Sequence, residues 1–156
     1  MNRRLLIIVL MACLLPLGMQ AQQGTFRFAQ LTDIHLTPNN PNPTEDLLRS
    51  IAQINATDSI DFVLVTGDLT EEGDRATMEK VKSCLDLLKV PYHVALGNHE
   101  TKWSDSGCTA FGEIFGGERF EFEHKGFLFL GFNSGPLMRM AYGLSLIHIS
   151  EPTRRV

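Results

Sequence analysis

Three short polar motifs, each directly after an apolar run typical of a β-strand, constrain this 156-residue chain more than any other feature. The motifs are Asp33-Ile34-His35, Gly67-Asp68 and Gly97-Asn98-His99-Glu100, and they follow the runs 26–32, 61–66 and 92–96. Asp33 and Asp68 are 35 residues apart, and Asp68 and Asn98 are 30 apart, so each interval can hold one crossover helix. The sequence therefore predicts an α/β domain with a parallel sheet and with the motifs at the carboxyl ends of its strands.

Two amphipathic helices are predicted in the intervals between these strands. The first is expected to begin at Thr44, which can cap it, and the second to end before Pro91. Apolar residues recur at helical spacing, Leu47, Leu48, Ile51 and Ile54 in the first helix and Met78, Val81, Cys84, Leu85 and Leu88 in the second. After the third motif we expect a polar loop over 101–119 and then a β-hairpin of 120–123 and 127–132, with His124 at the surface in its turn.

The polar residues of the three motifs suit a divalent metal site. Carboxylate, amide and imidazole groups together are typical ligands of Zn²⁺, Mn²⁺ or Fe, whereas a thiolate site would need cysteines. Because side chains two residues apart share a face of a strand, Asp33 and His35 can bind one ion together. Asp68 carries two carboxylate oxygens and can bridge two ions. Each motif alone also fits an ordinary turn or capped loop, but the three in this order predict one converging site.

In this order the motifs resemble those of the calcineurin-like metallophosphoesterases, over roughly residues 26–135. The resemblance implies an α/β fold, the calcineurin-like four-layer α/β/β/α sandwich, in which two facing mixed sheets are flanked by helices and this chain supplies the N-terminal portion. It also implies two divalent metal ions, Mn, Fe or Zn. Asp33 and His35 would bind the first ion, and Asp68 would bridge both.

The resemblance assigns roles to three further residues. Asn98 would bind the second metal ion, and His99 would be the general acid that protonates the leaving-group oxygen. Glu71 would hydrogen-bond His99 through its carboxylate and fix its tautomer. The implied reaction is hydrolysis of a phosphodiester or phosphomonoester by a water molecule that two metal ions activate. The surroundings of the motifs look most like the cyclic nucleotide phosphodiesterase group, so a small phosphoester, cyclic nucleotides included, is the expected substrate.

The chain departs from the family pattern after its third motif. The family has a later Gly-His and Gly-His-x-His, but the histidines after His99 are only His124 and His148, and neither stands in such a motif. We therefore expect residues 22–143 to be the N-terminal part of the phosphoesterase domain, 144–156 to be a non-native tail, and the chain to be an inactive fragment. The alternative is a non-catalytic metal-binding or carbohydrate-associated module on a degenerate phosphoesterase scaffold.

Residues 1–21 have the form of a secretory signal peptide. Arg3 and Arg4 precede an apolar run at 5–17, and a small residue ends the segment. The run is shorter than the roughly 20 residues that a transmembrane helix needs. The sequence thus predicts export to the periplasm or the extracellular space. Lipid attachment at Cys13 is disfavoured because the apolar run continues past it.

The charge of the remaining chain limits its partners. Without the two leader arginines it has 12 basic and 18 acidic residues, a net charge of about −6. Nucleic-acid binders normally carry a basic patch, so no nucleic-acid partner is expected. Cys84 falls at an apolar helical position, so a buried thiol is expected in preference to a disulfide with Cys108. The sequence leaves the oligomeric state open.

Overall fold

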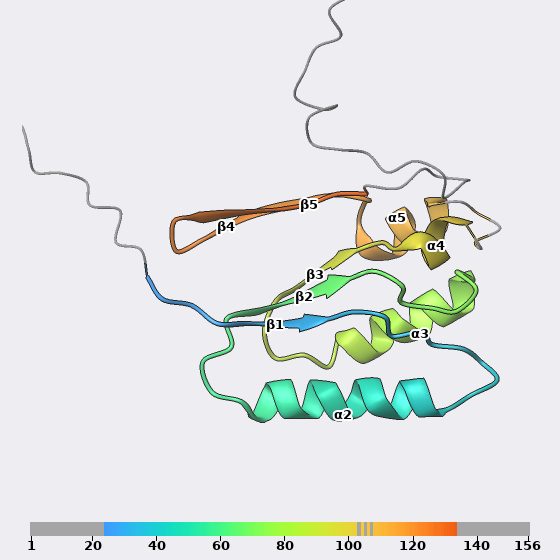
Figure 1. Cartoon of the computed structure of the whole chain (residues 1–156), viewed down its shortest axis with the longest axis horizontal. Coiled ribbons are helices and arrows are strands. Elements are labelled where there is room, and N and C mark those ends of the chain that lie inside the picture. Colours follow the sequence, from blue (N-terminus) through green and yellow to red (C-terminus); the bar gives the residue numbers. More distant parts are fainter. Residues whose placement is uncertain (1–23, 103, 105, 107, 134–156) are drawn as a thin grey trace, which may run out of the picture.

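The computed structural model describes residues 24–102, 104, 106 and 108–133, so the predicted signal peptide, Cys13, His148 and the segment 144–156 lie outside the described residues. The elements follow in the order β1 (Phe28–Leu31), α2 (Asn42–Ala56), β2 (Phe62–Thr66), α3 (Arg75–Leu85), β3 (Tyr92–Ala95), α4 (Asn98–Lys102), α5 (Thr109–Phe115), β4 (Phe120–His124) and β5 (Phe127–Gly131) (Figure 1). This order confirms the predicted alternation of strands and helices and the hairpin after it.

The first three strands form a parallel sheet in the order β1-β2-β3. Phe28 pairs with Phe62, and Val63 pairs with Tyr92. The continuous apolar run of β2 is explained by its central place, because a strand between two neighbours with layers on both faces is buried on both sides. All three strands end at the same edge of the sheet, so this edge receives the three polar motifs.

Helices α2 and α3 cover one face of this sheet (Figure 1). Val63 and Val65 of β2 point to that face and are fully buried. They belong to one core cluster with the helix residues Leu47, Ile51, Met78, Val81, Cys84 and Leu85. Cys84 is a buried free thiol, as predicted. Cys108 is a free thiol that is buried as well, and burial raises its pKa to about 11.

The start of α2 differs from the prediction. The helix begins at Asn42 after Pro41, and Thr44 lies inside its first turn, so the predicted cap at Thr44 is wrong. Pro43 is tolerated there because the first-turn N–H groups of a helix have no partner within the helix. Leu48 is 39% exposed, so it lies off the buried face formed by Leu47 and its neighbours.

Part of the predicted loop at 101–119 is helical. It contains the end of α4 and the whole of α5, which packs on α3 through the buried Ala110 and Phe111. Gly116 ends α5 with a φ of +88°, a conformation that favours glycine. The segment was predicted as a loop because its apolar residues are too few to mark a helical face. Among the described residues, no helix combines the length and the apolar character needed to cross a bilayer.

The antiparallel hairpin β4-β5 faces the other side of the parallel sheet, so two sheets pack face to face (Figure 1). The packing is aromatic: the ring of Phe122 stacks on His93 of β3 at 3.7 Å between centroids, and it contacts Phe62 of β2 edge-on at 5.1 Å. Burial lowers the pKa of His93, which favours its neutral form in this layer. Phe129 of β5 also packs on Phe62.

An ionic cluster around Asp61 attaches the hairpin to the amino ends of the parallel strands. The Asp61 carboxylate accepts hydrogen bonds from Lys125 Nζ at 2.8 Å and from the Arg27 N–H at 3.0 Å. These contacts, the Lys125 bond first, lower the pKa of Asp61 to about 2. His124 is the last residue of β4, with Nε2 3.2 Å from the same carboxylate and a side chain only 26% exposed. The prediction that His124 lies at the surface in the turn is therefore wrong.

Candidate metal centre

The structure brings five of the six predicted site residues into two overlapping groups. Asp33, His35 and Asp68 form one group, and His35, Glu71 and His99 form the other. Within each group, one ligand atom of each residue lies within 4.8 Å of those of the others. The sixth residue, Asn98, is half-buried at the start of α4, directly before His99.

Main-chain hydrogen bonds join the first loop to the second beyond the ends of β1 and β2. The Asp33 N–H donates to the Gly67 carbonyl at 3.2 Å, and the His35 N–H donates to the Asp68 carbonyl at 3.0 Å. The same pattern continues from the Leu36 N–H to the Leu69 carbonyl at 3.0 Å. These bonds fix the relative position of the first two motifs independently of side-chain identity.

Three of the predicted metal ligands have left-handed backbone conformations. The φ angles are +53° at Asp33, +48° at His35 and +49° at Asp68. Such conformations cost a residue with a side chain roughly 1–2 kcal/mol and cluster at functional sites. They also change the reason why Asp33 and His35 meet. The two residues lie in the loop after β1, not on one face of a strand, and their side chains approach to 3.9 Å.

Two glycines allow the second and third loops to approach each other closely. A Cβ atom on Gly97 would lie 2.2 Å from Oδ1 of Asp68 and 2.3 Å from its main-chain nitrogen. A Cβ atom on Gly67, whose φ is +89°, would lie 2.7 Å from the Gly97 Cα atom. Only glycine at these positions leaves room for the observed place of the Asp68 carboxylate.

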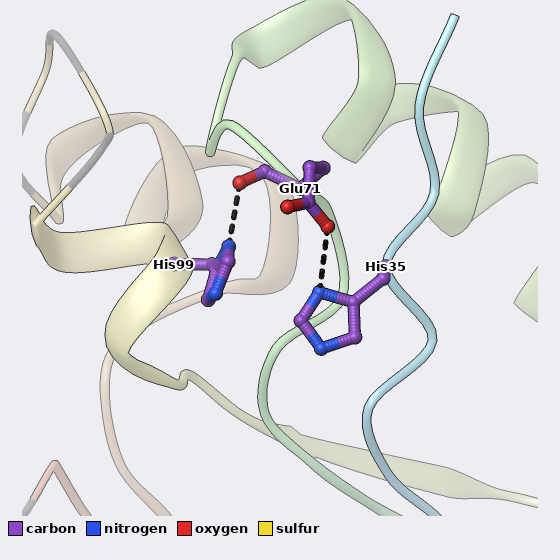
Figure 2. A group of neighbouring side chains, drawn as sticks. All are labelled: His35, Glu71 and His99. Carbon is purple, nitrogen blue, oxygen red and sulfur yellow. Dashed lines mark hydrogen bonds and ion pairs between the residues drawn. The ribbon is translucent and has the colours of Figure 1, made fainter. Parts of the chain in front are cut away.

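Glu71 contacts both histidines of the site, through different atoms (Figure 2). Its carboxylate lies 3.0 Å from Nδ1 of His35, a contact without the alignment of a hydrogen bond. Its main-chain carbonyl lies 2.5 Å from Nδ1 of His99. The resemblance implied that the carboxylate of Glu71 holds His99, but the acceptor at Nδ1 is the main-chain oxygen of that residue. The two imidazole rings lie edge to face, with centroids 4.7 Å apart.

The hydrogen bond to a carbonyl determines which nitrogen of His99 carries a proton. A carbonyl oxygen only accepts hydrogen bonds, so Nδ1 of His99 must be the donor. The Nε2 atom is then the ring nitrogen that can give or take a proton. In the third loop, the main-chain N–H of His99 donates to Oδ1 of Asp68 at 3.1 Å, which ties the histidine to the predicted bridging ligand.

The ligand atoms of both groups fit the predicted kind of metal. They are carboxylate oxygens and imidazole nitrogens, the set that suits Zn²⁺, Mn²⁺ or Fe, and no thiolate belongs to either group. The side chains of Asp33 and Glu71 are 62% and 52% exposed, so ions and substrate can reach them from solvent.

The burial of Glu100, the last residue of the third motif, was not predicted from the sequence. Glu100 is fully buried, and its carboxylate accepts hydrogen bonds from both the second and the third loop. The motif itself contained the residue, but nothing in the sequence separates a buried acid that binds main-chain N–H groups from an exposed one.

A family model and several known proteins match the sequence of this chain. The family model described as calcineurin-like phosphoesterase matches residues 26–150. A protein of Rhodopseudomonas palustris named a probable cyclic nucleotide phosphodiesterase is 32% identical over 97 residues, which cover 58% of this chain and 33% of that protein. Proteins with the same name from Xenorhabdus bovienii and Moraxella catarrhalis are 30% and 31% identical over 47% and 49% of this chain, and over 34% and 28% of their own lengths. The chain thus spans about a third of the length of these curated relatives.

Proposed function

Because the chain belongs to the calcineurin-like phosphoesterase family, we propose that its three motif loops bind two divalent metal ions and that the whole protein hydrolyses phosphodiesters. The family membership also confirms the calcineurin-like α/β fold, of which the described residues form a helical layer and two facing sheets. Metal-dependent hydrolysis of phosphoesters is the chemistry of the family. The number of ions, their identity and the substrate belong to our proposal.

The observation that carries the proposal is the convergence of the two ligand groups at the carboxyl ends of β1, β2 and β3. Asp33 and His35 would hold the first ion, and Asp68, which stands between the first and third loops, would bridge both. Asn98 would hold the second ion. Bound ions supply Lewis acidity, which lowers the pKa of water and offsets the negative charge of a phosphoester.

His99 would act as the general acid. Its Nδ1 atom is held by the Glu71 carbonyl, so the imidazole keeps its orientation when Nε2 loses a proton. As an imidazolium, His99 would give its Nε2 proton to the leaving-group oxygen as the ester bond breaks, which would convert the forming alkoxide to an alcohol and leave the neutral ring with its proton on Nδ1. The Glu71 carboxylate, 3.0 Å from His35, would orient that ligand, as carboxylates beside metal-bound histidines commonly do.

The proposed substrate class is a small phosphodiester such as a cyclic nucleotide. The names of the relatives support this class, and the acidic net charge argues against nucleic acid as partner. We also propose export of the protein, on the evidence of the leader-like residues 1–21.

The test is an assay of the full product of the gene, purified and freed of metal. We expect hydrolysis of bis(4-nitrophenyl) phosphate and of 3′,5′-cyclic AMP after addition of Mn²⁺, Fe²⁺ or Zn²⁺, and loss of turnover with EDTA. Turnover that persists in EDTA would contradict the metal-dependent mechanism. Tight binding of Mn²⁺ without turnover of either ester would instead support the non-catalytic metal-binding module.

A further inference from the structure

The Glu100 carboxylate is the most completely buried acidic group in the described part of the chain, with an exposed fraction of 0%. Its Oε1 atom accepts from the Leu69 N–H at 2.8 Å, from the Thr70 N–H at 3.1 Å and from Thr70 Oγ1 at 3.4 Å. Its Oε2 atom accepts from the Gly97 N–H at 2.8 Å. A buried carboxylate is costly unless it is satisfied, and here main-chain N–H groups from two loops satisfy it.

These bonds have a different role from those between the first two loops. The first and second loops are joined by a main-chain ladder that needs no particular side chain. Three groups hold the second and third loops together. The Asp68 carboxylate accepts from the His99 N–H, the Glu71 carbonyl accepts from Nδ1 of His99, and the Glu100 carboxylate accepts from the N–H groups of Leu69, Thr70 and Gly97. Since Asp68 and His99 both belong to the proposed site, Glu100 is, of these three groups, the one that lies outside it.

We propose that Glu100 is a positioning residue that sets the place of Asn98 and His99 relative to Asp68. This inference rests on the proposed metal site. Leu69 and Gly97 are direct chain neighbours of Asp68 and Asn98, so the two oxygens of Glu100 hold the backbone beside one ligand from each loop. Loss of this link should disturb the second ion, which needs both loops, far more than the first, which Asp33, His35 and Asp68 bind.

The variant that tests this is Glu100→Gln, which keeps the size of the side chain. A carboxamide has one oxygen and one NH₂ group, so it cannot accept from Leu69 and Gly97 on opposite sides at once. One main-chain N–H group then faces the NH₂ group of the carboxamide, which is also a donor, so this N–H group is left without an acceptor in the protein interior. Glu100→Asp is the second variant, because it keeps both oxygens but withdraws them by one methylene.

The experiment is a calorimetric titration of the metal-free protein with Mn²⁺, which uses no catalytic turnover. In the wild type we expect two binding events. In Glu100→Gln we expect the weaker event to lose about 10–100-fold in affinity, the range known for residues that orient metal ligands, and the tighter event to change less than about threefold. Amide hydrogen exchange without metal should show loss of protection at Leu69 or Gly97. Glu100→Asp should fall between the two proteins.

A matched control separates positioning from stability. Val81→Ala removes buried core contacts of α3 without changing a motif residue or a hydrogen bond between the loops, and should lower the thermal midpoint while leaving both Mn²⁺ affinities unchanged. Equal weakening of both events in Glu100→Gln, unchanged affinities, or failure of both Glu100 variants to fold would each overturn the positioning role. A wild-type protein that binds no Mn²⁺, or only one ion, would overturn the proposed site itself.

Discussion

The Nδ1 atom of His99 lies 2.5 Å from the main-chain carbonyl oxygen of Glu71. The acceptor is thus part of the backbone, so it cannot be removed by substitution or protonated in the pH range of most proteins. The carboxylate of the same residue is directed to His35, 3.0 Å away. Glu71 therefore contacts both histidines. A mutation can remove the contact of its carboxylate with His35 and leave the contact of its carbonyl with His99 in place.

The substitution Glu71→Gln should leave the tautomer of His99 unchanged, because the carbonyl that binds Nδ1 remains. We expect the nitrogen chemical shifts of His99 to report a proton on Nδ1 in both proteins, by long-range ¹H–¹⁵N NMR. The affinity for Mn²⁺ should fall by about tenfold, which is the low end of the range known for loss of a residue that orients a metal ligand. We expect the low end because the Glu71 carboxylate is half exposed. A switch of His99 to the Nε2–H tautomer in Glu71→Gln would show that the carboxylate holds the ring.

His99→Ala and Asp68→Ala should separate acid catalysis from metal binding. His99→Ala removes the proposed proton donor, so turnover should fall by about 10²–10⁴-fold while Mn²⁺ stays bound. Asp68→Ala removes the proposed bridging ligand and should weaken Mn²⁺ binding by more than the roughly 100-fold that an orienting residue costs. Asp58→Ala, at an exposed site between α2 and β2, is the control. Metal loss in His99→Ala would make that residue a ligand.

Gly97→Ala should damage the site without any change of a ligand. The added Cβ would lie 2.2 Å from Oδ1 of Asp68, so the second and third loops must move apart. We expect a lower thermal midpoint and at least about tenfold weaker Mn²⁺ binding. The matched control is Gly112→Ala in α5, where a Cβ meets nothing within 4 Å and should stabilise the helix by roughly 0.5–1 kcal/mol. Wild-type affinity in Gly97→Ala would contradict the steric argument.

The cluster around Asp61 should make stability depend on pH in the acid range. The pKa of Asp61 is lowered from 3.8 to about 2 in the folded protein, so its contribution is fully present above about pH 4 and is lost as pH falls toward 2. Asp61→Asn should therefore unfold at lower temperature than the wild type at pH 7, and the difference should shrink between pH 4 and 2. Thermal unfolding across this range is the measurement.

The control for Asp61 is Asp46→Asn, which breaks only the exposed ion pair with Arg49 on the surface of α2. Exposed pairs contribute little, so its thermal midpoint should match that of the wild type at every pH. A difference between Asp61→Asn and the wild type that stays constant from pH 7 to 2 would show that the carboxylate charge is not what holds the hairpin.

Much of the fold was predictable because hydrophobic periodicity reports burial directly. The apolar run at 61–66 and the helical spacing from Met78 to Leu85 mark one central strand and one packed helix, and both are confirmed. The short α5 was missed, since its place depends on packing against α3 and not on its own pattern. The start of α2 at Asn42 was missed because Pro43 is read as a breaker, although the first turn of a helix accepts it.

The order of motifs along the chain was enough to predict which residues meet at the site. Three motifs after three parallel strands must reach the same edge of the sheet, so Asp33, Asp68 and His99 converge whatever the details of the loops. How these residues are held depends on contacts that exist only in the folded chain. Main-chain groups from segments distant in the sequence determine three features of the site. These are the left-handed backbone at the ligands, the contact between Gly67 and Gly97, and the burial of Glu100. A sequence pattern records side chains, but not which N–H group or carbonyl oxygen the fold places beside them.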